Sequence, residues 1–118
     1  PIQYAFSFPK RLHLNGERLD LFKQQKLEFF EPDIKKFKCL GLAYEAINKG
    51  GNMPCILNAA NEIANVAFRN GQCSFTGMAT IIEQTMAKAT FDKNPNLDVY
   101  LQTDKEARAI ASEIIKKY

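Results

Sequence analysis

The chain has 118 residues, of which 46% are hydrophobic and 25% are charged, a composition typical of a globular domain with a single core. Its 16 basic and 13 acidic residues give a net charge of +3 and are spread along the chain. This balance gives no electrostatic case for a nucleic-acid partner. The apolar runs are short and interrupted by charged residues, which excludes a transmembrane helix and predicts no membrane partner.

The beginning of the chain and its cysteines bear on the cellular compartment. The first eight residues are apolar, but they lack the basic flank and the cleavage site of a secretory signal. Cys39, Cys55 and Cys73 are odd in number and have no CxxC spacing, so we expect three free, buried thiols in a reducing compartment. A cytoplasmic protein is predicted. The sequence opens at Pro1 without an initiator methionine, which suggests a segment of a longer protein.

Residues 1–38 are predicted to form an irregular arm. They contain three prolines, and their apolar spacing changes repeatedly. Residues 26–30 could form one short strand, but a lone strand needs a partner sheet. We therefore expect the arm to pack on a part of the protein that precedes it.

From Cys39 onward the spacing becomes helical. Apolar residues three and four apart predict a first helix that ends at Gly50 and Gly51, which can act as a glycine C-cap. A second helix is expected from about Pro54, a favourable first-turn proline, to Arg69.

Two further helices complete the predicted domain. The third should begin near Thr76 as N-cap, and the fourth should open with the capping box Thr103-x-x-Glu106. The predicted fold class is mainly α, a small four-helix bundle preceded by an irregular arm with at most one short strand. The predicted domains are residues 1–38, an arm or linker, and residues 39–118, the helical bundle.

No catalytic, cofactor-binding or metal-binding residue is predicted in this segment. The six glycines form neither GxGxxG nor a P-loop, so no phosphate cradle can be drawn. The sequence from Asp92 resembles the start of a calcium loop, but Leu97 stands where a glycine must turn and Thr103 where a bidentate glutamate belongs. The calcium interpretation fails.

A polar stripe on the second helix is the one candidate functional feature. Its members fall at offsets of zero, three, four and seven, so they share one helix face: Asn58, Asn61, Glu62 and Asn65. Alanines surround them, and short amides among alanines suit close approach to another backbone. We predict that the stripe is a structural interface between domains, the alternative being a merely exposed polar face. Asn61 and Glu62 are expected to bond backbone groups of the arm or of a preceding domain.

Several motifs resemble the C-terminal part of the 1-deoxy-D-xylulose 5-phosphate reductoisomerase family. The most specific are residues 39–46, Cys-Leu-Gly-Leu-Ala-Tyr-Glu-Ala, and residues 57–62, Leu-Asn-Ala-Ala-Asn-Glu. Residues 1–5, Pro9, and residues 18–21 and 27–33 are similar to the family in the same order. The resemblance covers essentially the whole chain.

The resemblance implies the end of a catalytic domain, a linker and a C-terminal helical domain. It implies that the full-length enzyme converts 1-deoxy-D-xylulose 5-phosphate to 2-C-methyl-D-erythritol 4-phosphate in isoprenoid biosynthesis. NADPH and a divalent cation, magnesium or manganese, would be its cofactors, and a homodimer its assembly. The family's cofactor loop and metal ligands would lie upstream of Pro1, so this segment would brace the active site without catalysing the reaction. The alternative is a free-standing helical protein-interaction module.

Overall fold

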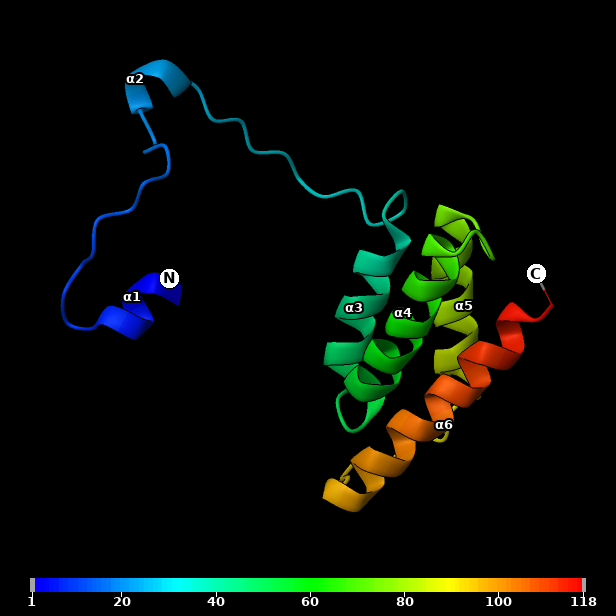
Figure 1. Cartoon of the computed structure of the whole chain (residues 1–118). Helices are drawn as coiled ribbons and strands as arrows, with labels where there is room; N and C mark the ends of the chain where they lie inside the picture. Colours follow the sequence, from blue (N-terminus) through cyan, green and yellow to red (C-terminus); the bar gives the residue numbers. More distant parts are fainter. Residues whose placement is uncertain (1, 118) are drawn as a thin grey trace. The chain divides into compact units, whose positions relative to one another are not determined.

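A computed structural model describes residues 2–117 and contains six helices in that range. The chain divides into two compact units, Pro1–Glu31 and Pro32–Tyr118. The first contains α1 (Ile2–Ser7) and α2 (Leu21–Gln24), and the second contains α3 (Lys38–Lys49), α4 (Met53–Arg69), α5 (Phe75–Lys88) and α6 (Leu97–Ile115) (Figure 1). The expected fold class, a mainly α chain with a small four-helix bundle, is confirmed.

The first unit has no core of its own. Neither α1 nor α2 contains a buried residue. Its large hydrophobic side chains are exposed, among them Phe6 and Phe22 at 90% and 91%. No strand occurs between residues 2 and 117, and residues 26–30, which could have formed one short strand, have no regular secondary structure.

In the second unit, α4 is the central helix. It packs against α3, α5 and α6, and α6 also packs against α5; Figure 1 shows α6 running diagonally across the bundle. Four alanines of α4 are buried, as are Ala107 and Ala111 of α6. Such small side chains let the helix backbones approach closely, and larger residues such as Ile56, Ile81 and Ile82 fill the space beside them.

The turn between α3 and α4 requires glycine. Gly50 and Gly51 have φ values of 67° and 56°, in the left-handed region that disfavours side chains. A Cβ on Gly51 would overlap the carbonyl oxygen of Asp92 and lie 2.9 Å from the Cα of Lys93. Gly51 therefore also permits close contact with the loop between α5 and α6.

The boundaries of α3 and α4 agree with the sequence prediction to within one residue. The N-cap predicted for α5 was wrong. Ser74, not Thr76, caps this helix, and its hydroxyl accepts a hydrogen bond from the Gly77 amide at 3.0 Å. Thr76 lies two residues after Ser74, within the first turn of α5 and directly before Gly77, so it is not the cap of this helix.

The capping box predicted at Thr103 was also wrong. Helix α6 begins six residues earlier at Leu97, where Asn96 Oδ1 accepts from the Val99 amide at 2.9 Å. Thr103 and Glu106 lie within the helix and bond to other segments. Their hydroxyl and carboxylate serve tertiary contacts instead of a helix end.

Candidate functional site

The predicted stripe is exposed along α4 in this chain. Asn58, Asn61, Glu62 and Asn65 all lie on its outward face. Asn58 Nδ2 donates to Glu62 Oε1 at 3.3 Å, one helical turn away. The side chains of Asn61 and Asn65 make no hydrogen bond to any residue between 2 and 117. Their amides are thus available to a partner outside this part of the chain.

Glu62 does not bond a backbone group here. Its Oε2 accepts from Arg108 Nη2 of α6 at 2.7 Å, and Arg108 Nε donates to Asp104 Oδ2 at 2.7 Å. Arg108 therefore joins α4 to α6 and holds the Glu62 carboxylate in one orientation. The prediction of a backbone partner for Glu62 is not met within this chain.

The ion pair shifts the pKa values of both Glu62 and Arg108. The hydrogen bond and the positive charge of Arg108 lower the pKa of the Glu62 carboxyl below its ordinary value of 4.5. Hydrogen bonds to Asp104 and Glu62 raise the pKa of the Arg108 guanidinium. Both groups are charged at neutral pH, and with Asp104 they form a cluster of one guanidinium and two carboxylates that links the stripe to α6.

A buried asparagine that sequence analysis missed connects three segments of the bundle. Asn52 is 1% exposed and precedes α4. Its Nδ2 donates to the Thr90 carbonyl and to Thr103 Oγ1, both at 2.9 Å, and its Oδ1 accepts from the Asp92 amide at 2.9 Å. The Asn52 backbone amide also donates to the Asp92 carbonyl at 3.0 Å. Its polar side-chain atoms are thereby paired, as burial requires.

Glu106 strengthens the same junction. Its Oε1 accepts from the Thr90 amide at 3.2 Å and from the Thr90 hydroxyl at 2.9 Å. We call the set Asn52, Thr90, Asp92, Thr103 and Glu106 the loop junction. It fixes the end of the bundle where the α3–α4 and α5–α6 connections meet.

The cysteines differ from expectation in burial. All three are free, but Cys39 is exposed, and Cys55 and Cys73 are partly buried. Desolvation raises the pKa of both the Cys55 and the Cys73 thiols. Cys39 escapes burial because α3 lies at the edge of the bundle and buries only Leu42 and Ala46.

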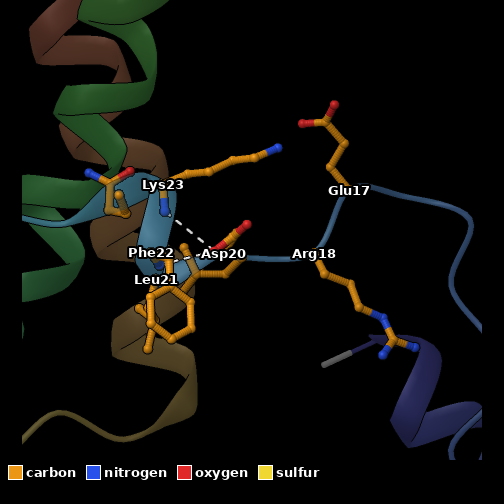
Figure 2. Close-up of a pocket in the computed structure, with 8 residues that line it drawn as sticks. Glu17, Arg18, Asp20, Leu21, Phe22 and Lys23 are labelled. Atoms are coloured by element: carbon orange, nitrogen blue, oxygen red, sulfur yellow. Dashed lines mark hydrogen bonds between the residues drawn. The ribbon is translucent and has the colours of Figure 1, made fainter.

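Two hollows offer no built chemical site. One of about 960 Å³ is lined by the consecutive residues 17–24 of the first unit (Figure 2). There Asp20 Oδ1 caps α2 by accepting from the Phe22 and Lys23 amides at 3.0 and 3.3 Å. The other, about 460 Å³, lies over the loop junction, whose buried polar groups already have partners.

Residues 2–117 contain no group of three or more His, Cys, Asp or Glu side chains placed to hold a metal ion. Within the same range, no helix combines the length and the apolar character that crossing a bilayer requires. The exposed surface includes the outward face of α4 and the uncovered apolar side chains of the first unit.

Comparison with known proteins identifies the family. A family model described as the DXP reductoisomerase C-terminal domain, where DXP is 1-deoxy-D-xylulose 5-phosphate, matches residues 1–110. The chain belongs to this family.

Curated DXP reductoisomerases align over nearly the whole chain. The protein from Bacteroides fragilis is 51% identical over 117 residues, which is 99% of this chain and 30% of that protein. The protein from Methylococcus capsulatus is 43% identical over 115 residues, 98% of this chain and 29% of that protein. The chain thus spans about 30% of the length of the reductoisomerases it matches.

Solved DXP reductoisomerases have the same fold in the matching region. The enzyme from Zymomonas mobilis, in complex with NADPH, aligns with a TM-score of 0.82 at 36% identity, covering 98% of this chain and 30% of that one. A DXP reductoisomerase with fosmidomycin and magnesium aligns with a TM-score of 0.77 at 34% identity, covering 98% and 31%. The resemblance seen in the sequence motifs is confirmed by both comparisons.

Proposed function

We propose that this chain is the C-terminal part of an NADPH-dependent oxidoreductase that converts 1-deoxy-D-xylulose 5-phosphate to 2-C-methyl-D-erythritol 4-phosphate in isoprenoid biosynthesis. The observation that carries the proposal is the family match over residues 1–110. Identity of 51% over 117 residues to a curated reductoisomerase supports it. The free-standing interaction module is disfavoured, because these relatives contain the same region as about 30% of an enzyme.

The segment itself is proposed to be structural. Its described residues include no metal-ligand cluster, and its sequence has no phosphate-binding loop, so they fit neither magnesium nor the phosphates of NADPH. Both groups are assigned to the remainder of the enzyme. Solved relatives with NADPH and with magnesium support these cofactors for the full-length protein.

We assign residues 1–38 to the end of the catalytic domain and its linker, and residues 39–118 to the bundle domain. The preceding catalytic domain of the same chain is the proposed partner, in a cytoplasmic homodimer. The exposed apolar side chains of the first unit favour this assignment, since they are costly in water and suit burial against another part of the enzyme.

The experiment compares two purified proteins. The full-length protein should oxidise NADPH in the presence of 1-deoxy-D-xylulose 5-phosphate and magnesium or manganese, and the 118-residue chain alone should do neither this nor bind NADPH. No turnover by a folded full-length protein would refute the reaction. Turnover by the chain alone would refute its structural role.

A further inference from the structure

Asparagine is followed by glycine at two places in the sequence, Asn15-Gly16 and Asn70-Gly71. Such a pair is chemically reactive, because glycine has no side chain to obstruct its backbone nitrogen from attacking the preceding asparagine side chain. This chemistry contributes to the thermal lability of asparagine in proteins. All four residues are exposed, so exposure does not separate the two pairs. Their hydrogen bonds differ.

The pair at Asn70 is held by the end of α4. The Gly71 amide, which would have to act as the nucleophile, donates to the Phe68 carbonyl at 3.0 Å. The next amide, that of Gln72, donates to the Ala67 carbonyl at 2.8 Å. These bonds close the C-terminal turn of the helix. Attack on the Asn70 side chain therefore requires the helix end to open first.

The pair at Asn15 has the opposite arrangement. The Gly16 amide makes no hydrogen bond to any residue between 2 and 117. The Asn15 Oδ1 lies 3.1 Å from His13 Nδ1, and since an amide oxygen can only accept, the imidazole is the donor. This hydrogen bond polarises the side-chain carbonyl and stabilises the negative charge that gathers on its oxygen when a nucleophile adds. The nucleophile is thus free, and the group that it attacks is activated.

We propose that Asn15 is a site of spontaneous deamidation promoted by His13, and that the end of α4 protects Asn70. The Gly16 nitrogen bonds to Cγ of Asn15 and gives its proton to solvent. The bond between Cγ and Nδ2 then breaks, and the nitrogen takes up a proton and leaves as ammonia. Water opens the resulting cyclic imide at either carbonyl, which gives aspartate or isoaspartate. The site gains a negative charge, and isoaspartate also lengthens the main chain of the arm.

Peptide mass spectrometry of the incubated full-length protein measures both sites in one sample. Incubation in water enriched in heavy oxygen marks the imide that opens during this step and so excludes deamidation during digestion. Asn15 should convert at least about tenfold faster than Asn70, a difference of about 1.4 kcal/mol in activation free energy. It should yield two products of equal mass that chromatography separates. Equal rates, or faster conversion of Asn70, would overturn the proposal.

Two variants test the features that promote the reaction. A Cβ at Gly16 would meet only side-chain atoms of Leu14, at 3.8 and 3.9 Å, so Gly16→Ala fits the structure while it obstructs the attacking nitrogen. It should slow conversion of Asn15 at least about tenfold and leave Asn70 unchanged. His13→Ala should slow conversion of Asn15 about threefold, the effect of one exposed hydrogen bond. An unchanged rate in either variant would overturn the role assigned to that residue.

Urea provides the control for the fold. Unfolding removes the hydrogen bonds around both pairs, so Asn15 and Asn70 should then convert at rates within about threefold of each other. A difference that persists unchanged in urea would arise from the neighbouring sequence and would overturn the structural explanation. The comparison requires no NADPH turnover. Its outcome is therefore separate from that of the proposed function.

Discussion

Replacing Asn52 with alanine should destabilise the bundle strongly, although the residue lies in a connection and outside any helix. The substitution removes hydrogen bonds to the Thr90 carbonyl, to Thr103 Oγ1 and to the Asp92 amide, all at 2.9 Å. These partners lie 38 to 51 residues away in the sequence. A single side chain thus holds together segments that are distant along the chain.

The magnitude follows from the burial of each partner. Thr103 is 3% exposed, so its hydroxyl would be left inside the bundle without Asn52, at a cost of about 1–3 kcal/mol. Thr90 is exposed and Asp92 is partly exposed, so their backbone groups can recruit water and lose only about 0.5–1.5 kcal/mol each. We expect a total of about 3 kcal/mol, which corresponds to a fall in Tm of about 12–24 °C for a domain of this size.

Urea unfolding followed by far-UV circular dichroism measures this loss. Asn48→Ala is the matched control, because Asn48 is an exposed asparagine near the end of α3, and it should change stability by less than about 0.5 kcal/mol. Thr103→Val in the Asn52→Ala background removes the stranded hydroxyl and should recover part of the loss. If Asn52→Ala is no more destabilising than Asn48→Ala, the reasoning about the loop junction is refuted.

Three further predictions follow from the backbone, the charges and the unit boundary. Gly51→Ala should lower the free energy of unfolding in urea by over about 1 kcal/mol more than Gly71→Ala does. Both glycines have a positive φ, but only a Cβ at Gly51 would meet the α5–α6 loop. Equal losses of stability for the two variants would contradict this explanation. The folded-state pKa of Glu62 lies below 4.5, so its pairing with Arg108 stabilises the fold above pH 4.5 and is lost as the pH falls through the lowered pKa. Glu62→Gln should therefore lose stability relative to wild type at neutral pH and converge with it in acid, and a pH-independent difference would contradict the ion-pair explanation. Limited proteolysis should trim the N-terminus and leave a core of about residues 32–118, identified by mass, and early cleavage within α4 or α6 would argue against an independent bundle.

Local sequence signals predicted most of the bundle. The glycines at 50 and 51 end α3, and apolar spacing gave α4 to within one residue because its buried positions recur with helical period. The start of α6 was missed because Leu97 and Leu101, in its first turns, are 72% and 64% exposed and do not continue the core pattern. The Thr103-x-x-Glu106 pattern then resembled a helix start.

Hydrogen bonds between residues distant in the sequence explain why the capping box was predicted wrongly and why Asn52 was missed. A capping box and a tertiary contact use the same residue types, and only the fold decides which of them forms. Thr103 meets Asn52 at a separation of 51 residues, and Glu106 meets Thr90 at a separation of 16. No local pattern marks Asn52, since an asparagine beside two glycines is equally typical of an exposed turn. The polar stripe was placed correctly on one helix face, while its burial against a partner stays a prediction.

The first unit contains segments whose sequence favours regular structure but which cannot hold it stably without tertiary packing. Helix α2 has a proper N-cap in Asp20, yet with four residues it is too short to be stable without tertiary packing. Leu27 and Phe29, at 63% and 89% exposure, alternate with polar residues as in a half-buried strand. A strand gains its hydrogen bonds from a neighbour, so residues 26–30 can become one only where another sheet edge is present. Without such a neighbour, these residues have no regular secondary structure, although their sequence pattern permits a strand.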